Sequence, residues 1–505
     1  MKILPVCSMQ ETDRRSAEDQ NITEAALIKR AGKACYDKIF SQKLIKSRNE
    51  NIAVVCSHSN NSADGFALAS LLLKNGYKNT KVYFTGSEEK MKAACAEVFK
   101  ETNSLSVGFV ERISETDLER LGENLAKADV IIDALIGVGF KGKLREKEAK
   151  IVDLINQSPA KVISIDIPTG LNADTGAFDP VCVNADFTLV INNYKYGNVL
   201  GFGSDCCGKQ LLTDIGLNQY DELEGSLLLT KDFVKSCVPE RKNNSNKYDF
   251  GNVLVIGCNK GMAGSGIMSA EASLKSGCGL VSIACPENNL DIVSIKAPLE
   301  IMTTPLKNDY SNIDDLLKKK DTVVFGMGLG KDGDFEVLLG SLLMREINLI
   351  VDADGLYYLA VLKDEIKNKK ANLIVTPHTK EAANLLYIKT EEVKNDPVAA
   401  AKEISSSYNC TTVLKGHNTF ICASDLSSYI CMNGNSGMAT AGSGDVLSGI
   451  IAGVGGKRCE VKNVCLGVYL HGLAGDIAAE EYGKISMTAT DITRHIHNAF
   501  ENIMN

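Results

Sequence analysis

Short runs of β-branched and apolar residues alternate with longer helix-like stretches along almost the whole chain. Strands that alternate with helices predict a parallel β-sheet, because parallel strands need a helical crossover between them and are covered by helices on both faces. In such sheets, ligands bind at the carboxyl ends of the strands. The alternation therefore predicts an α/β fold and indicates where functional residues should be sought.

The alternation occurs in two series, separated by a break that starts near residue 216. After a helix-like opening at Ser16–Ile39, the first series predicts strands at Ile52–Cys56, Lys81–Phe84, Val130–Asp133, Val162–Asp166 and Phe187–Ile191, with helices such as Gly65–Lys74 and Glu115–Ala128 between them. The second predicts strands at Val253–Gly257, Leu280–Ala284, Thr322–Gly326, Asn348–Asp352, Asn372–Thr376 and Thr411–Lys415, a β-like pair near Phe420–Ile430, and helices at Ser443–Val454 and Val461–Glu480. A chain of 505 residues exceeds the size of one ordinary domain. We therefore predict two α/β domains with a boundary near residue 220.

The composition argues against several classes of partner. The net charge is −8 and no block of Lys and Arg occurs, whereas nucleic-acid binding needs a concentrated basic surface. No apolar run approaches the roughly 18–20 residues of a membrane helix, and the first residues lack the apolar run of a secretory signal. The sixteen cysteines show no zinc-binding spacing and fit small buried side chains in a reducing compartment. We expect a cytoplasmic protein with no membrane or nucleic-acid partner.

The most informative segment is a Gly-rich turn, Gly442–Asp445, that leads directly into an apolar helix. Glycines allow the backbone to approach a ligand, and the free N–H groups of a helix start attract an anion such as a phosphate. A carboxylate at this position makes sense if Asp445 accepts a hydroxyl proton while the turn stabilises a transferring phosphoryl group. The alternative is that Asp445 only offsets the helix dipole and the glycines only form a turn.

This segment and its surroundings, from about residue 226 to the end, resemble the NAD(P)H-hydrate dehydratases, a branch of the ribokinase-like proteins. The matching pieces follow the order of that family: Asn246-Lys247 with Gly251, Gly257 through Gly264-Ser265-Gly266, Glu271–Val281, Gly326–Gly330, Asp352–Ala360, Thr376–Glu381, Lys415-Gly416, Gly442–Asp445 and His471–Glu480. The resemblance implies a ribokinase-like αβα domain that uses a nucleotide and Mg²⁺. It also implies ADP as the cosubstrate, because fused bacterial and archaeal forms depend on ADP.

The resemblance also assigns roles in this half. The residues that would contact the hydrated nicotinamide nucleotide are Ser265, Gly328, His378 and Asp445, with Asp445 as the catalytic base. Those that would hold the adenine nucleotide are Lys415, Gly416, His417, Asn418, Thr419 and Gly444. The family usually has Ala in place of Ser265. From the residues alone, His378 could equally be a surface or capping residue, and Asp352 and Asp354 could be metal-linked carboxylates or turn residues.

Polar side chains follow three predicted strands of the first series. Asn60, Asn61 and Asp64 follow the first of these strands, Asp133 ends the second, and Asp166 and Thr169 lie at the end of the third. Oxygen atoms brought together at one sheet edge would suit a hard cation. The alternative is that these polar loops only turn the chain.

These pieces, with Leu27–Gly32, resemble the NAD(P)H-hydrate epimerase domain, a Rossmann-like αβα sandwich. The resemblance implies a K⁺ site made by Asn61, Asp133 and Thr169. It implies a substrate site made by Asn60, Asn61, Ser62, Ala63, Asp64, Gly137, Val138, Gly139, Phe140, Lys141, Gly142, Lys143 and Asp166, in which Asp166 and Lys141 form the acid–base pair. The family loop is Gly-rich, whereas this chain has Ser62 and Ala63. If these residues need a positive φ, each adds about 1 kcal/mol of strain.

We therefore interpret the chain as a bifunctional enzyme that repairs hydrated NADH and NADPH (NADHX and NADPHX). Residues 1–217 would epimerise the R and S hydrates, 218–225 would be a linker, and 226–505 would dehydrate the S form, converting ADP into AMP and phosphate. The alternative is a ribokinase-like small-molecule kinase with a non-catalytic N-terminal binding domain. We also expect a homo-oligomer, a state that no motif specifies.

Overall fold

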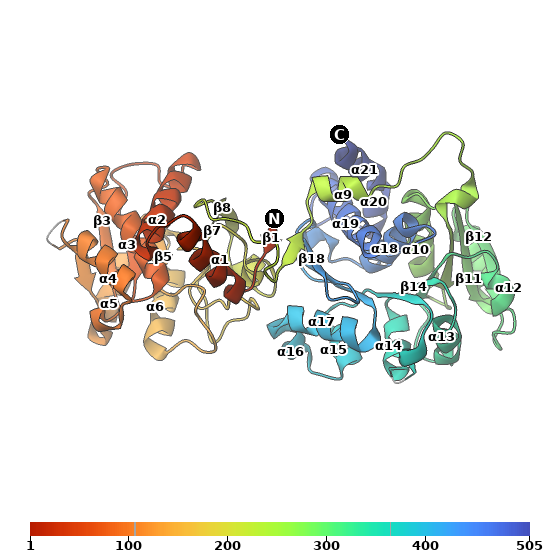
Figure 1. Cartoon of the computed structure of the whole chain (residues 1–505). Helices are drawn as coiled ribbons and strands as arrows, with labels where there is room; N and C mark the ends of the chain where they lie inside the picture. The colour runs from red at the N-terminus through yellow and green to blue at the C-terminus, as the bar shows by residue number, and fades with distance from the viewer. Residues whose placement is uncertain (106–107, 364) are drawn as a thin grey trace. The chain divides into compact units, whose positions relative to one another are not determined.

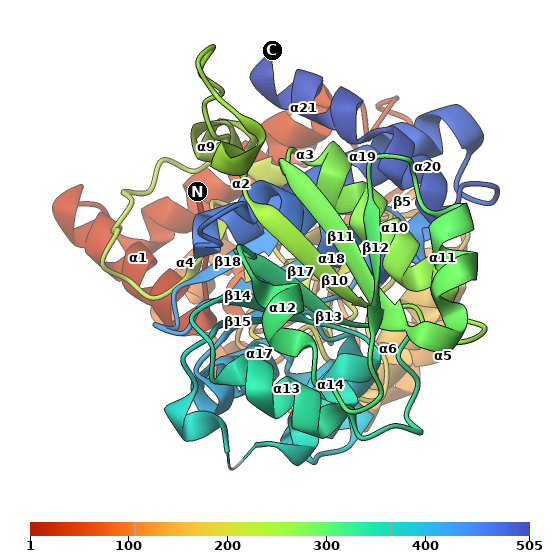
Figure 2. The same ribbon diagram turned by 90° about the vertical axis from the view of Figure 1, so that its right-hand side faces the viewer.

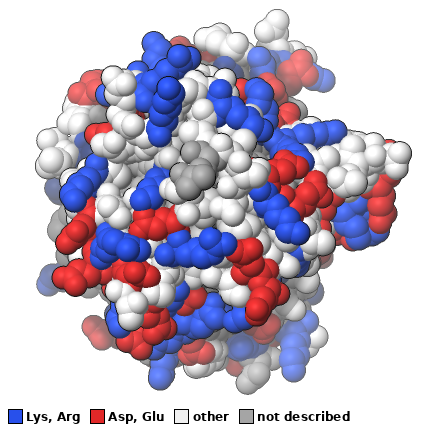
Figure 3. Space-filling view, turned by 90° about the vertical axis from the view of Figure 1, so that its left-hand side faces the viewer, with Lys and Arg blue, Asp and Glu red and all other residues white. Residues whose placement is uncertain are grey.

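The computed structural model describes residues 1–105, 108–363 and 365–505, and the chain divides into two compact units, Met1–Gly225 and Ser226–Asn505. Each unit is an α/β structure built on its own sheet (Figure 1). In the described ranges, no helix is long and apolar enough to cross a membrane. On the face of the first unit that Figure 3 shows, basic and acidic side chains are intermixed.

The first unit is built on a seven-stranded parallel sheet with the strand order β4-β3-β2-β5-β6-β7-β8. The strands of this sheet are β2 (Ile52–Cys56), β3 (Thr80–Phe84), β4 (Val110–Arg112), β5 (Val130–Ala134), β6 (Lys161–Ile165), β7 (Phe187–Ile191) and β8 (Lys209–Thr213), and the short strand β1 (Lys2–Ile3) lies outside it. Its helices are α1 (Val6–Asp19), α2 (Glu24–Ser41), α3 (Asn60–Lys74), α4 (Ala93–Asn103), α5 (Leu118–Ala126), α6 (Glu146–Gln157), α7 (Tyr196–Val199) and α8 (Gly203–Cys206).

Two hydrophobic cores hold this sheet between its helices. Along β2, Ile52 and Val54 pack in the core formed with α2, α3 and α4, whereas Ala53 and Val55 pack in the core formed with α5 and α6. Successive residues of a strand point to opposite faces, so a strand that is apolar throughout must be covered on both. The predicted three-layer arrangement is therefore present in this unit.

The second unit contains a larger sheet in the order β9-β18-β17-β16-β15-β14-β13-β10-β11-β12. Its strands are β9 (Ser226–Leu228), β10 (Asn252–Gly257), β11 (Leu280–Pro286), β12 (Met302–Leu306), β13 (Thr322–Met327), β14 (Asn348–Val351), β15 (Asn372–Val375), β16 (Thr411–Leu414), β17 (Thr419–Cys422) and β18 (Ser428–Cys431). In the order given, every neighbouring pair between β15–β16 and β11–β12 is parallel. The pairs β16–β17 and β17–β18 are antiparallel. The predicted β-like pair is thus a hairpin extension of the parallel sheet.

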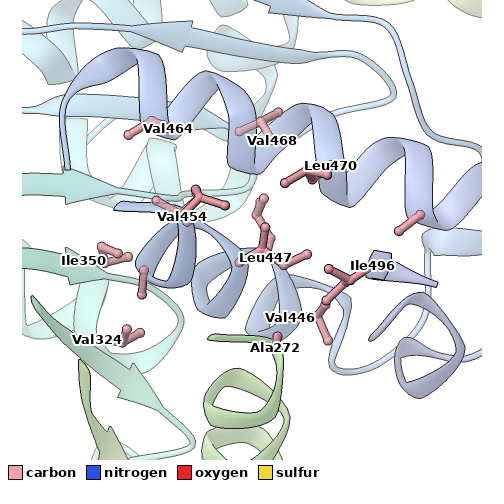
Figure 4. Packing of buried hydrophobic residues seen from close by; sticks show 14 of the residues in the cluster. Ala272, Val324, Ile350, Val446, Leu447, Val454, Val464, Val468, Leu470 and Ile496 are labelled. Carbon is pink, nitrogen blue, oxygen red and sulfur yellow. The ribbon is translucent and has the colours of Figure 1, made fainter. Parts of the chain in front are cut away.

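Helices cover both faces of this sheet (Figures 1 and 2). They are α9 (Lys231–Cys237), α10 (Ala263–Lys275), α11 (Leu290–Lys296), α12 (Ile313–Leu317), α13 (Phe335–Leu343), α14 (Asp354–Val361), α15 (Thr379–Leu386), α16 (Thr390–Asn395), α17 (Pro397–Tyr408), α18 (Ser443–Gly455), α19 (Val461–Tyr482), α20 (Ala489–Arg494) and α21 (Ile496–Met504). Helix α18 is apolar nearly all round and packs between α10, α19 and the sheet; Figure 4 shows Val446, Leu447 and Val454 within this core. A helix buried on all sides is held firmly, so its first turn is a well-positioned place for a site.

Candidate active sites in the two units

A cavity of about 540 Å³ lies at the carboxyl ends of the strands in the first unit. It is lined by the start of α3, the loop after β5, and residues of α1 and α2. The predicted residues that line it are Asn60, Asn61, Asp64, Gly137, Val138, Gly139 and Asp166. Ser62, Ala63 and Phe140 are instead buried in the protein, and Lys141, Gly142 and Lys143 are exposed and outside the lining. Seven of the predicted residues therefore come together, and the Phe140–Lys143 segment does not join them.

The start of α3 corrects the expectation of strain in the substituted loop. The helix begins at Asn60, five residues before the predicted start, because the Ser59 side chain caps it by accepting a hydrogen bond from Ser62 N. Ser62 and Ala63 therefore have helical backbones and do not need a positive φ. The Ser62 hydroxyl donates to Ala134 O (2.6 Å) and accepts from Ser57 N (2.7 Å), so it joins the helix to β2 and β5.

Asp166 forms its ion pair with Lys195, a lysine that the sequence analysis did not select. Lys195 is 1% exposed and also donates to Ile191 O (3.1 Å), while Asp166 accepts a hydrogen bond from Ile191 N (2.9 Å). Asn198 fixes both partners, because its side chain accepts from Lys195 N (2.9 Å) and donates to Asp166 O (3.1 Å). The predicted pair of Asp166 with the exposed Lys141 is therefore not formed.

Three further carboxyl groups, those of Asp13, Glu24 and Asp64, line the same cavity. Burial raises the pKa of Asp13 to about 6, with Asp166 adding to the shift and Lys195 opposing it. Burial and the charge of Asp166 also raise the pKa of Asp64 well above its usual range. The cavity thus combines a lysine–aspartate pair with carboxyl groups that retain protons more readily than usual, as a proton-transfer site requires.

The predicted K⁺ ligands surround the end of β5. Asp133 is buried and accepts hydrogen bonds from Thr169 N (2.9 Å), Thr169 Oγ1 (2.6 Å) and Ser164 Oγ (2.8 Å). Burial raises the pKa of Asp133 although these hydrogen bonds oppose the shift, and no cationic side chain in the described ranges pairs with it. Asn61 Nδ2 is buried without a hydrogen-bond partner in the described structure. A flip of the amide exchanges its nitrogen and oxygen, so the oxygen can take this position. A buried carboxyl group without a cationic partner and an unpaired amide are groups that suit a bound monovalent cation.

A larger cavity, of about 800 Å³, lies at the carboxyl ends of β14, β15 and β16 in the second unit. The predicted residues that line it are His378, Lys415, Gly416, His417, Thr419, Gly444 and Asp445. Ser265, Gly328 and the buried Asn418 lie outside its lining. Five of the six residues predicted to bind the nucleotide thus share one cavity with Asp445, the predicted base.

Lys415 is held at the start of α18 by two carboxylates. Its Nζ lies 2.8 Å from Asp352 Oδ1 and 3.8 Å from Glu381 Oε2. Burial lowers the pKa of Lys415, but Asp352 and Glu381 outweigh burial and leave it above its ordinary value. A Cβ on Gly444 would lie 3.3 Å from Lys415 Nζ, so the glycine keeps the space between the ammonium group and the helix start open. A phosphate at this point would meet both a lysine and free backbone N–H groups.

Asp445 lies in the first turn of α18, after Gly442, whose φ of +88° turns the chain into the helix. Burial raises the pKa of Asp445 to about 6, and the charge of Asp352 adds to the shift. A hydrogen bond from the Ser265 side chain and the charge of Lys415 oppose the shift. A carboxylate with this pKa is ionised at neutral pH and accepts a proton better than an ordinary aspartate, which suits a general base.

His378 is a capping residue that also lines the cavity, and its contact with the substrate stays a prediction. It caps α15, because its Nδ1 accepts hydrogen bonds from Lys380 N (3.1 Å) and Glu381 N (3.2 Å), and it also lines the cavity. Asp352 is a buried partner of Lys415 that accepts from Ser448 Oγ (2.5 Å). Asp354 accepts from Gly330 N (2.9 Å), as a residue of the turn would.

Two ionisable residues of the cavity had no role assigned from the sequence, Glu381 and His471. Burial raises the pKa of Glu381 to about 7, and burial lowers that of His471 to about 4, so His471 is neutral near pH 7. Its Nε2 lies 3.3 Å from Ser443 Oγ. Both belong to segments that match the dehydratase pattern, and this match is the signal by which they could have been selected.

Known proteins match both units. The family model described as NAD(P)H-hydrate dehydratase matches residues 253–498, and the model described as the N-terminus of YjeF-related proteins matches residues 24–197. Among solved structures, a ribokinase-like superfamily protein from Enterococcus faecalis V583 has 27% identity and a TM-score of 0.50, covering 57% of this chain and 98% of its own. The fold and the second cavity therefore define a ribokinase-like α/β protein with a further α/β domain.

Relatives that contain both domains identify the family more narrowly. The bifunctional NAD(P)H-hydrate repair enzyme of Coxiella burnetii is 33% identical over 489 residues, which cover 95% of this chain and 96% of the relative. That of Escherichia coli K12 is 31% identical over 485 residues, covering 95% and 90%. The chain belongs to the family of bifunctional NAD(P)H-hydrate repair enzymes.

Proposed function

We propose that this chain restores hydrated NADH and NADPH in two steps. Residues 1–217 epimerise the R and S hydrates, residues 226–505 dehydrate the S hydrate at the expense of a nucleotide, and residues 218–225 link the two. The observation that carries the proposal is the cavity at the start of α18, where Asp445 and Lys415 accompany a helix start that can hold a phosphate. The proposal rests also on the family to which the chain belongs.

In the dehydratase step, the ring hydroxyl of the hydrate loses its proton to Asp445 Oδ as its oxygen attacks the terminal phosphorus of the nucleotide. The helix start and Lys415 stabilise the charge of the transferring group. The P–O bond to the nucleotide breaks, and the ring then loses the new phosphate and a proton to regain its double bond. Phosphorylation thus replaces hydroxide, a poor leaving group, by phosphate.

A Mg²⁺ ion is expected to enter with the nucleotide, since Mg²⁺ is commonly held by substrate phosphates and one or two carboxylates. Glu381 is the cavity carboxylate that fits this role, because burial raises its pKa and a cation beside it would compensate its charge. When bound, the ion would neutralise phosphate charge.

We also propose ADP, rather than ATP, as the nucleotide. The support is the fusion of both domains in one chain with the epimerase-like domain first, the arrangement of the ADP-dependent bacterial and archaeal forms. An ADP user must place its β-phosphate where an ATP user places the γ-phosphate, and Lys415–Thr419 is the segment expected to make that adjustment. Initial rates with ADP and with ATP freed of ADP, on the same epimer, test this; faster turnover with ATP would overturn the donor and leave the dehydratase proposal intact.

In the epimerase step, Asp166 and Lys195 are the proposed proton-transfer pair, since they form a buried contact at the cavity. A K⁺ ion held by Asn61, Asp133 and Thr169 would supply positive charge for the phosphates of the substrate. Asp133→Ala should therefore lower epimerase activity and its response to K⁺, while dehydration of the S hydrate continues.

One experiment tests the whole proposal: the purified protein is mixed with both hydrate epimers and ADP, and recovery of NADH is followed. Complete recovery, faster than spontaneous epimerisation allows, supports both steps. Recovery that stops at half of the hydrate would show an inactive N-terminal domain. No recovery, together with a stable phosphorylated alcohol, would favour the small-molecule kinase.

A further inference from the structure

The second unit has another cavity, of about 710 Å³, at the edge of the sheet opposite to the dehydratase site. Phe250 and Cys278, which precede β10 and β11, line it, as do Leu274 and Val454 near the ends of α10 and α18. The dehydratase cavity is lined from the carboxyl ends of strands, whereas this one lies at their amino ends. The two cavities are therefore separate. The start of α18 lines the dehydratase cavity, and the end of the same helix lines this one.

Positive charge predominates around this cavity, although the chain as a whole has a net charge of −8. Five cationic side chains line it against two carboxylates: Arg241, Lys275, Lys457, Arg458 and Lys462, with Asp249 and Glu460. Both carboxylates are engaged, because Asp249 accepts from Asn246 N (2.8 Å) and Glu460 pairs with Lys462 (3.0 Å). Lys275 pairs with Glu271 (3.3 Å). Lys457 and Arg458 are exposed and have no ion-pair partner in the described structure.

The segment that carries Lys457 and Arg458 is fixed to the sheet. The side chain of Thr322 donates to Gly456 O (3.0 Å), and that of Asn348 donates to Lys457 O (3.2 Å). Both anchoring side chains are buried. Two unpaired cations are thus presented from a held backbone, which lowers the entropy lost when they bind a ligand.

Arg241 is also held in place. Its guanidinium lies over the ring of Phe250, 4.0 Å from the centroid, and donates to Gly277 O. A planar guanidinium fixed by stacking is well suited to hydrogen bonding with a phosphate. The walls between these cations are apolar and include Leu274, Val454 and Phe500.

Compensation of helix dipoles accounts for Lys275, in the last turn of α10, but for only part of this arrangement. Cations favoured by a helix C-terminus lie within its last turn, because the effect falls off beyond it. Lys457 and Arg458 follow the end of α18 at Gly455, and Arg241 comes from a different segment. The cavity has the volume of an ordinary small-molecule site, with apolar walls and a few polar groups.

We propose that this cavity is a second ligand site, which binds a phosphorylated small molecule with an apolar or planar body, such as a nucleoside monophosphate. Arg241, Lys457 and Arg458 would hold its phosphate, and the apolar walls would contact its body. This assignment concerns binding alone and does not depend on the proposed catalytic function.

The test is calorimetric titration of the full chain with AMP, and separately with inorganic phosphate, in three proteins. These are the wild type, the double variant Lys457→Glu/Arg458→Glu, and a control of equal charge change at exposed positions outside the lining of both cavities, Lys307→Glu/Lys394→Glu. We expect the wild type and the control each to show one more AMP site than the cavity variant. Hydrogen exchange should show AMP slowing exchange at residues 455–459 in the first two only.

The same number of AMP sites in the wild type and in the cavity variant would overturn the proposal. Inorganic phosphate that binds the second site as tightly as AMP would overturn the role of the apolar walls. If the charge-reversal variant does not fold, Arg458→Gln alone should weaken the second site about tenfold, because a lost hydrogen bond to a charged group is worth about 1.5 kcal/mol or more. An unchanged affinity in that variant would contradict the assignment.

Discussion

The two catalytic sites each contain a lysine bound to an aspartate, but they use the pair differently. Lys195 is buried against Asp166, the carboxylate that is itself proposed to exchange protons. Lys415 is bound to Asp352, which Ser448 also holds, while the proposed base, Asp445, is a separate residue. A contacting acid and base can remove and return one proton, as epimerisation requires. Separation of the cation from the base instead suits phosphoryl transfer, in which phosphate and proton need different partners.

The largest effect on activity is expected for Asp445→Asn, which tests whether the base of the second site is separate from its lysine–aspartate pair. The change keeps size and polarity but removes the proton acceptor, so dehydration should slow by about 10²–10⁴-fold. Nucleotide binding and epimerisation should remain near wild type. Initial rates of NADH recovery from the S hydrate measure the effect, and near-normal turnover by the folded variant would exclude Asp445 as the base.

The next effect concerns the Asp166–Lys195 pair. Asp166→Asn and Lys195→Met should each slow epimerisation by about 10²-fold or more, and the double variant should lose little beyond either single change, because the two residues act as a unit. Dehydration of the S hydrate serves as the internal control. Fully additive losses would show that the two residues act independently.

The pH dependence of dehydration sharpens the contrast between the sites. Asp445 must be ionised to accept a proton, and burial raises its pKa to about 6. The rate should therefore be level above that pH and fall about tenfold for each pH unit below it. Rates at saturating substrate measure this, and Asp445→Asn provides the control profile. A rate that stays level down to pH 4.5 would contradict the assignment.

The smallest effect is expected for Ser62→Ala, which tests how the substituted loop is held. Loss of the hydroxyl leaves Ala134 O and Ser57 N without their partner, so the free energy of unfolding of the first unit should fall by about 1–2 kcal/mol. Urea denaturation followed by epimerase activity measures the change. Ser104→Ala, which removes an exposed hydroxyl, should change it by less than about 0.5 kcal/mol. Equal changes in the free energy of unfolding for both variants would show that the Ser62 hydrogen bonds add no stability beyond that of an exposed hydroxyl.

The comparison also shows what the sequence could disclose. Strands such as β2 and β10 were predicted to within a residue, because continuous apolar runs bounded by turns are local signals. The early start of α3 was missed because a serine cap looks like loop sequence, and β8 and β12 were missed because both are only partly buried. Lys195 carries no motif of its own: the chain after β7 brings it to Asp166, 29 residues earlier in the sequence. By contrast, the position of Asp445 at the start of a helix beside a cavity was predictable, because its glycines and helix are contiguous in the sequence.

The segment Lys415–Asn418 is the turn of a hairpin, since β16 and β17 pair in antiparallel register on either side of it. The length of such a turn can change without disturbing the register of its strands, because the added residues extend away from the sheet. Asp445 is carried by α18, which is anchored independently in the core. Under the proposed roles, residues 416–418 of this turn set the donor preference and α18 carries the base, so exchanging those three residues, with Lys415 kept, should change the preferred phosphate donor without removing the base.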